Sequence, residues 1–334
     1  MKTVELGRTG QQVSQLALGA MIMGTSTDEP TSVEMLDRFL DAGGNFIDTA
    51  NCYCWWARPG SLGGESEELL GRWLPGRRDR VFLATKGSAM VWEQDGVWRD
   101  GRAEPDWALA RTRFEGAGAA TLTKAIDDSL RRLRTDHVDL YYVHVDDRAT
   151  PLEETLEALA GIVAAGKARY IGWSNVRTWR LERIRQLCAA NGWPAPVALQ
   201  QQHTYLRPKA GLDSASIVDD EQLDYLREHD DLSLVAYSPI LKGVYDSAAK
   251  RDGHWAMANY EGPDAQARLA AVAEVAAELG ATPNQVVLAW LLRVSPTTIP
   301  LVGPRTLAQY ETAHAALDVV LSDEQVTRLD AAGA

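Results

Sequence analysis

Four side chains able to move a proton onto a carbonyl oxygen stand at or just beyond the ends of successive apolar segments. Asp48 ends FID, Lys86 ends VFLATK, His144 ends VDLYYVH, and Tyr53 follows Asp48 by five residues. A phenol with a pKa near ~10 is a poor acid at neutral pH, because efficient acid catalysis needs a pKa nearer the working pH. We expect the Lys86 ammonium to lower the pKa of the phenol, the Asp48 carboxylate to hold that ammonium, and the imidazole to orient the carbonyl.

The segments that carry these residues belong to a regular alternation of strands and helices. Helical periodicity is clear in 121–134, where Ile126, Leu130 and Leu133 share one face. Alternating strands and helices imply parallel strands joined by right-handed crossovers, and eight such units make a TIM barrel. We therefore expect one α/β domain, 1–334, with a (β/α)8 barrel. The apolar runs predict eight strands, at 13–19, 45–49, 81–86, 138–144, 168–174, 197–201, 232–238 and 297–303.

A doubly wound sheet is the alternative architecture. It would need the glycine fingerprint G-x-G-x-x-G after the first strand, where the sequence instead reads LALGAMIMGT. Before that strand, 4–6 and 13–15 flank Gly7-Arg8-Thr9-Gly10 and predict a β-hairpin. The longest irregular stretches, 87–118 and 240–262, follow the third and seventh predicted strands. Both leave from the strand ends where barrels place active sites, so we expect functional loops there.

Composition excludes several classes of protein. The chain has 334 residues with 34 basic and 46 acidic side chains, a net charge of −12, which argues against a nucleic-acid partner. No apolar run approaches the ~20 residues needed to cross a bilayer, and the first residues lack the apolar core of a signal peptide. The 3 cysteines make no disulfide framework. A reducing cytoplasm is the expected compartment, and homo-oligomers stay open.

Eight segments, in order along nearly the whole chain, resemble the aldo-keto reductase family. The resemblance implies a (β/α)8 barrel that binds NADPH across the carboxyl ends of its strands and reduces aldehydes and ketones. It also implies that Asp48, Tyr53, Lys86 and His144 are catalytic, in agreement with the chemistry above. The segments are GGNFIDTANCY (43–53), GGESEELLGRWL (63–74), LATKG (83–87), SLRRLRTDHVDLYYVH (129–144), GKARYIGWSN (166–175), LQQQHTYL (199–206), VAYSPILKG (235–243) and IPLVGPRTLAQY (299–310).

The resemblance implies a set of contacts at the nicotinamide end of the cofactor. Ser174 and Asn175 would hydrogen-bond the carboxamide, and Tyr237 would stack on the ring. Gln201 matches the family glutamine near the amide, although the glutamines on either side of it leave a slip of one residue open. The residues placed beside the nicotinamide by position are Ala20 and Met21.

At the phosphate end, Gly303 is expected to open a helix whose N–H groups face phosphate. Arg305 stands where the family binds the adenosine 2′-phosphate, which favours NADPH over NADH, and Gln309 would approach the adenine. Ala313 replaces the asparagine that the family usually places against the adenine, which puts one contact in question. The loop that clasps the pyrophosphate is implied to contain Ser238, Ile240, Lys242 and Gly243.

Tryptophan is unusually frequent, with 11 Trp against 4 Phe. One interpretation is a small aromatic core that the long loops pack for themselves. The other is a pocket walled by flat indole rings, which suits a ring-bearing carbonyl compound such as a keto-sugar or an aryl ketone. We expect the second. The tryptophans in the predicted rim loops are Trp55, Trp56, Trp92, Trp98, Trp107 and Trp255.

The sequence therefore predicts an NADPH-dependent reductase of a small-molecule carbonyl substrate. Oxidation of a sugar or alcohol hydroxyl by the same site stays open, as does a cofactor-sensing regulatory subunit on the same barrel. Cys52 and Cys54 have no further close ligands and predict no metal site. Asp146 and Asp147 do not suggest a glycosidase pair, because neighbouring side chains in an extended segment point in opposite directions.

Overall fold

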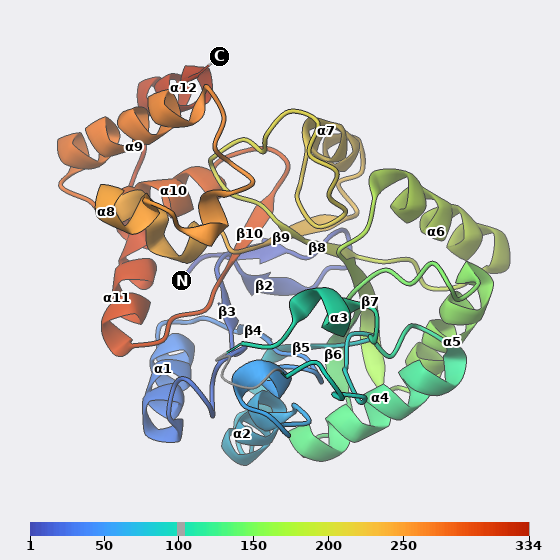
Figure 1. Ribbon diagram of the computed structural model, residues 1–334. Helices are drawn as coiled ribbons and strands as arrows, with labels where there is room; N and C mark the ends of the chain where they lie inside the picture. Colours follow the sequence, from blue (N-terminus) through green and yellow to red (C-terminus); the bar gives the residue numbers. More distant parts are fainter. Residues whose placement is uncertain (99–103, 334) are drawn as a thin grey trace.

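The computed structural model describes residues 1–98 and 104–333, in which strands and helices alternate around a central barrel (Figure 1). Within these residues eight parallel strands close in the order β10-β3-β4-β5-β6-β7-β8-β9. Because β10 pairs with both β3 and β9, the sheet has no open edge, and the predicted TIM barrel is confirmed. The strands are β3 Ala17–Gly19, β4 Phe46–Asp48, β5 Phe82–Gly87, β6 Val138–Val143, β7 Ala168–Ser174, β8 Ala198–Gln202, β9 Ser233–Tyr237 and β10 Thr298–Val302.

Helices surround the barrel and cover the outer faces of its strands (Figure 1). Parallel strands covered on both faces need continuous apolar runs, and every residue of β6 is accordingly buried. The predicted 121–134 helix is α4, which ends where Arg134 turns left-handed with φ 53°. The helices that follow the barrel strands are α1 Glu29–Asp41, α2 Glu65–Trp73, α4 Ala119–Leu133, α5 Leu152–Ala164, α6 Thr178–Asn191, α7 Asp220–Glu228, α9 Ala265–Leu279, α10 Pro283–Leu291 and α11 Leu307–Ala315.

A β-hairpin precedes the barrel, as predicted. Its strands β1 Thr3–Glu5 and β2 Gln12–Ser14 pair antiparallel. The predicted strand 13–19 is in fact divided between β2 and β3, because the chain leaves the hairpin at Ser14, whose backbone N–H donates to Asn45 at 2.7 Å. Leu6 packs with apolar side chains of the barrel interior, so the hairpin closes the end where the strands begin.

The two long stretches that follow β5 and β9 contain short helices instead of being irregular throughout. After β5, α3 Trp107–Arg111 begins at the N-cap Asp106 and lies in front of the strands in Figure 1; residues 99–103 of this stretch lie outside the described residues. After β9 come η3 Leu241–Asp246, α8 Ala248–Arg251 and η4 Trp255–Met257. Both stretches cover the carboxyl ends of the strands.

The chain ends in α12 Asp323–Ala331, which packs on α9. Its N-cap Ser322 and Gln325 form a capping box, so the first turn of the helix has its N–H groups satisfied. The remaining short turns are η1 Trp55–Ala57, η2 Arg78–Arg80 and η5 Ala316–Asp318. Among the described residues, no helix combines the length and apolar character needed to cross a membrane.

Candidate active site

Lys86 is the centre of a buried polar cluster at the carboxyl end of β5. It is fully buried, and its ammonium group donates to the carboxylate of Asp48, to the Thr49 carbonyl at 2.8 Å and to the Tyr53 hydroxyl at 2.9 Å. The second oxygen of Asp48 accepts from the amide of Gln200 at 2.8 Å. All three ammonium hydrogens thus have acceptors, which offsets the cost of burying this ion pair.

Three consecutive strands position the predicted catalytic residues. Asp48 ends β4, Lys86 lies in β5, and His144 follows β6. The loop that carries Tyr53 is held by two backbone hydrogen bonds, from Asn51 N to the Lys86 carbonyl at 3.0 Å and from Gly64 N to the Tyr53 carbonyl at 3.1 Å. The Tyr53 ring meets the His144 ring edge-on, with centroids 5.6 Å apart. The structure therefore brings all four residues together.

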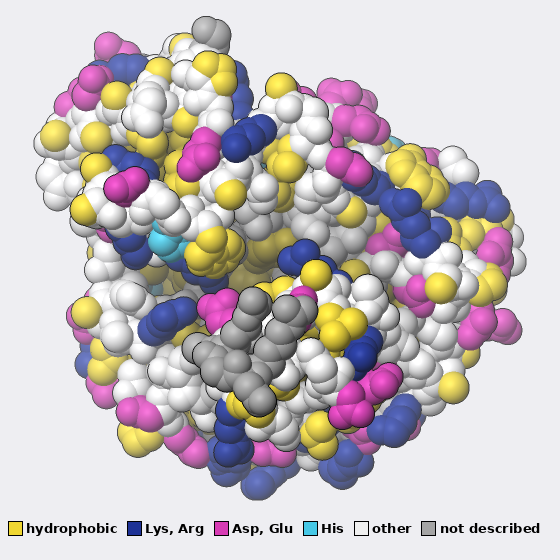
Figure 2. Space-filling model, viewed as in Figure 1, with side chains coloured by type: hydrophobic (Ala, Val, Ile, Leu, Met, Phe, Trp, Pro, Cys, Tyr) yellow, Lys and Arg dark blue, Asp and Glu magenta, His cyan; other side chains and the backbone are white. Residues whose placement is uncertain are grey.

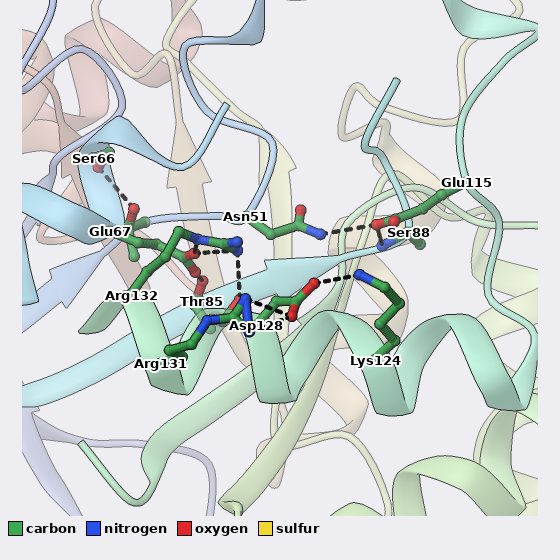
Figure 3. A network of polar contacts seen from close by, with 12 residues as sticks. Asn51, Ser66, Glu67, Thr85, Ser88, Glu115, Lys124, Asp128, Arg131 and Arg132 are labelled. Atoms are coloured by element: carbon green, nitrogen blue, oxygen red, sulfur yellow. Dashed lines mark hydrogen bonds and ion pairs between the residues drawn. The ribbon is translucent and has the colours of Figure 1, made fainter. Parts of the chain in front are cut away.

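A second polar network lies on the outer side of β5 and holds this strand in place (Figure 3). Glu67 is fully buried in the first turn of α2, where it accepts from the Thr85 hydroxyl and from the Arg132 guanidinium at 2.7 Å. It thereby links α2, β5 and α4. Glu65, Glu67 and Glu68 all lie in the first turn of α2, and nothing in the sequence distinguished Glu67 as a buried partner of Arg132.

The same view shows how the loop after β4 is fastened to the segment after β5 (Figure 3). The Asn51 side chain donates to the Glu115 carboxylate at 2.9 Å, and the same oxygen accepts from the Ser88 backbone N–H at 3.0 Å. Because Asn51 precedes the predicted acid by two residues, this link restrains Tyr53 from outside the barrel.

Burial controls the protonation of the cluster. Burial, and next the Asp48 charge, raises the pKa of Tyr53 well above its ordinary value. The net shift is thus opposite to the lowering expected from Lys86, because burial outweighs that charge, and the phenol stays neutral. Burial, and next the Lys86 charge, holds the pKa of His144 well below its ordinary value, so the imidazole is neutral as well. A neutral phenol and a neutral imidazole, both able to donate hydrogen bonds, thus lie side by side.

Residues predicted at the nicotinamide end form a connected group. Asn175 adopts φ 54° after β7, and its side chain donates to the His144 carbonyl at 2.7 Å and accepts from the Tyr237 hydroxyl at 2.9 Å. Ser174 accepts from the Asn175 amide at 3.0 Å. Ala20 is buried next to Asp48, to whose carbonyl its N–H donates at 2.8 Å. The predicted nicotinamide residues therefore adjoin the catalytic cluster.

Gln201 has its amide engaged within the protein. Its oxygen accepts from Asn175 N at 2.6 Å, and its nitrogen donates to the carbonyls of Val176 and Ala215 and to Gln222. Gln201 also lines a cavity of about 400 Å³ between the starts of α6 and α7, which contains none of the four predicted catalytic residues. Its neighbour on β8, Gln200, is the glutamine that faces Asp48. The inward-facing glutamine is therefore one residue before the predicted Gln201, within the slip of one residue that the sequence left open.

The phosphate end consists of a left-handed loop and the link before α11. Ser238, Lys242 and Gly243 have φ of 51°, 61° and 83°. The prediction that Gly303 opens a helix is wrong, because α11 begins only after its N-cap Thr306. The residues between Gly303 and Thr306 therefore form a short non-helical connection between β10 and α11.

Gln309, expected near the adenine, turns its side-chain oxygen back to the backbone N–H of Arg305 at 2.8 Å. Ala313, where the family usually has asparagine, is buried.

Two cations at this end fit an anionic group. Burial, and next the charge of Arg305, lowers the pKa of Lys242. Within 1–98 and 104–333 neither forms an ion pair. Figure 2 shows a hollow in this face of the molecule with basic and apolar side chains along its rim. Cations without an ion-pair partner among the described residues are the kind of group that can bind phosphate.

The rim tryptophans divide into three groups. Trp55 is only 1% exposed, and Trp56 and Trp107 contact it with ring centroids 6.0 and 5.4 Å away. Trp56 also meets the Tyr53 ring at 6.0 Å. Trp92 instead donates to Glu115, and Trp255 is 71% exposed on the loop after β9. The loops thus do pack an aromatic core, and only one of its rings contacts the predicted acid.

Comparison with known proteins gives a consistent result. The model of the Aldo/keto reductase family matches residues 15–334. Norsolorinic acid reductase stcV of Emericella nidulans is 33% identical, over 96% of this chain and 78% of the relative. Aryl-alcohol dehydrogenase [NADP(+)] of Phanerodontia chrysosporium is 27% identical, over 96% and 83%. The crystal structure of the thermostable aldo-keto reductase Tm1743 with the inhibitor epalrestat superposes with a TM-score of 0.71, at 26% identity over 99% of both chains.

Proposed function

Because the chain belongs to the aldo/keto reductase family, we propose that it reduces an aldehyde or ketone to the alcohol, with NADPH as electron donor and Tyr53 as the acid. One observation carries the proposal: the Tyr53 hydroxyl accepts a hydrogen bond from a fully buried Lys86 that is paired with Asp48. In this arrangement the Tyr53 proton is left free for a carbonyl oxygen, and the ammonium is placed to stabilise the phenolate that forms.

The residues divide the work as follows. Bound reduced nicotinamide supplies a hydride to the carbonyl carbon. Because burial raises the pKa of the phenol, Tyr53 keeps its proton until the carbonyl oxygen of the substrate gains negative charge. As the proton leaves, negative charge develops on the Tyr53 oxygen, 2.9 Å from the Lys86 ammonium. Their attraction is stronger in the transition state than before it, so it lowers the barrier. Neutral His144 donates a hydrogen bond to the same carbonyl oxygen and orients it.

The cofactor would lie along the rim from Asn175 and Tyr237 to Lys242 and Arg305. The guanidinium of Arg305, which forms no ion pair with the described residues, supports NADPH rather than NADH, because a planar fork suits the 2′-phosphate. The dehydrogenase relative carries NADP(+) in its name, which agrees with this choice.

The substrate that we propose bears a ring, either a sugar or an aromatic group. The support is Trp56, which is half-buried beside the Tyr53 ring and offers a flat amphipathic face. The name of the Phanerodontia relative specifies an aryl alcohol. That name also keeps oxidation of a ring-bearing alcohol as the second candidate function, since the same residues operate in both directions.

The test is the absorbance of NADPH while the protein is offered aldehydes, ketones and keto-sugars, with alcohols and NADP⁺ in a parallel series. Turnover of carbonyl compounds by wild type, lost in Tyr53→Phe, would support the reductase. Faster turnover of alcohols would reverse the direction. Tight NADPH binding without any turnover would favour a cofactor-sensing subunit.

The compartment is proposed from the cysteines. All three are free and buried, which suits the reducing cytoplasm.

A further inference from the structure

Two cysteines flank Tyr53, and they have different partners. Cys52 is 3% exposed, and its sulfur lies 3.4 Å from Nδ1 of His144. Cys54 is 1% exposed, and its sulfur lies 3.0 Å from the Met21 carbonyl and 3.1 Å from the Thr25 hydroxyl. One loop thus offers a thiol that contacts the predicted catalytic imidazole and a second, equally buried thiol that does not.

The role proposed for His144 requires one particular tautomer. A neutral imidazole carries a single proton, so one ring nitrogen donates and the other accepts. His144 is only half-buried, and its Nε2 forms no hydrogen bond with the described residues and is not enclosed. Nε2 is therefore the nitrogen open to a substrate. For Nε2 to donate, the single ring proton must sit on Nε2, and Nδ1 must carry none. A hydrogen-bond donor that points at Nδ1 stabilises this tautomer.

Cys52 is the group that can supply it. Burial raises the pKa of the Cys52 thiol far above its ordinary value, so sulfur keeps its proton. In the described part of the chain, no other side chain forms a hydrogen bond with Nδ1. The hydroxyl of Tyr53, whose ring meets the His144 ring, accepts from Lys86.

We propose that Cys52 is a positioning residue, whose S–H donates to Nδ1 of His144 and keeps the imidazole proton on Nε2, facing the carbonyl oxygen. The inference rests on the proposed function for its catalytic meaning. The hydrogen bond itself does not depend on it. Second-layer donors and acceptors set the tautomer of functional histidines in the same way.

The direct test is the ¹⁵N NMR spectrum of histidine-labelled protein, which distinguishes protonated from bare ring nitrogens. Wild type should show His144 with Nδ1 bare and Nε2 protonated. Cys52→Ser retains a donor and should preserve this pattern. Cys52→Ala removes it and should shift the Nδ1 signal toward the protonated form, as both tautomers become populated. Wild type with a protonated Nδ1, or a Cys52→Ala spectrum identical to wild type, would overturn the proposal.

The kinetic test compares the same variants on one ketone. Cys52→Ala should lower kcat about tenfold, equivalent to about 1.4 kcal/mol, with little change in NADPH affinity, and Cys52→Ser should restore most of the loss. Cys54→Ala, at the matched position, should leave the His144 spectrum as in wild type. If Cys52→Ala does not fold, Cys52→Val fills the space without a donor.

Equal kcat in Cys52→Ala, Cys52→Ser and wild type would contradict the positioning role. Absence of all turnover would instead defeat the proposed function, while the spectra would still decide the hydrogen bond.

Discussion

The catalytic end and the phosphate end of the barrel rim differ in whether their charged groups have partners within the protein. At the catalytic end the buried ion pair has its partners inside the protein: Lys86 has three acceptors, and Asp48 accepts from both Lys86 and Gln200. At the phosphate end neither Lys242 nor Arg305 forms an ion pair within the described residues. The first end is organised before anything binds, whereas the second is completed only by an anion.

Because of this difference, we expect one end to determine the rate of the chemical step and the other to determine the affinity for the cofactor. Preorganised groups lower a barrier because they need not rearrange as charge develops. Unpaired cations contribute when a phosphate arrives, and their contribution is present in the ground state and the transition state alike. Changes at the catalytic end should therefore act on kcat, and changes at the phosphate end on the binding of the cofactor.

Tyr53→Phe gives the largest expected effect. It removes the proton donor and keeps the ring packed against His144 and Trp56, so kcat should fall by the ~10² to 10⁴ typical of lost acid catalysis. The dissociation constant of NADPH, measured by fluorescence titration, should stay near that of wild type. A variant that retains most of its kcat would remove Tyr53 from the mechanism.

Lys86→Met tests whether the ion pair serves both chemistry and folding. Loss of the cation should lower kcat by a similar ~10² or more, because nothing stabilises the developing phenolate. It also leaves the buried Asp48 carboxylate uncompensated, which should lower the free energy of unfolding by about 3–5 kcal/mol in urea titrations.

The matched control is the double variant Asp48→Asn with Lys86→Met, which buries no unpaired charge. It should regain part of the stability and none of the activity. Recovery of activity in the double variant would contradict the role given to Lys86.

Arg305→Ala tests the other end. Loss of a charge-assisted hydrogen bond, roughly 1.5–3 kcal/mol, should weaken NADPH binding about 10- to 150-fold, with NADH little affected. At saturating cofactor kcat should be unchanged. If wild type binds NADH as tightly as NADPH, Arg305 does not contact the 2′-phosphate. A fall in kcat in the variant would contradict the expectation that the phosphate end affects only the binding of the cofactor.

Trp56→Ala has the smallest expected effect and refines the boundary of the catalytic end. The indole that contacts the Tyr53 ring should contribute to binding of the substrate, so KM for ring-bearing carbonyl compounds should rise about tenfold, the equivalent of 1.4 kcal/mol. Propanal, which cannot stack, should change little. Trp92→Ala is the control, because Trp92 bonds Glu115 away from Tyr53. Equal losses for propanal and for cyclic compounds would assign Trp56 to packing of the loop alone.

The order of strands and helices, and the polar residues at three strand ends, could be predicted from the sequence alone. Both follow from local rules: apolar runs must be buried, and consecutive parallel strands place their carboxyl ends on one rim. The sequence alone therefore predicted that Asp48, Lys86 and His144 lie on neighbouring strands. Tyr53 was predicted beside them, because it follows the first of these strands within a few residues.

Which side chains contact one another, however, was decided by the tertiary structure. Which of the glutamines on β8 faces Asp48 depends on strand phase, since a shift of one residue turns a side chain to the other face. The burial that raises the pKa of Tyr53 depends partly on Lys86 and His144, which come from other segments of the chain. The contact between Cys52 and His144 joins residues 92 positions apart. Periodicity and composition contain no information on such pairs, because they describe each segment by itself, whereas a hydrogen bond needs two segments brought within a few ångströms.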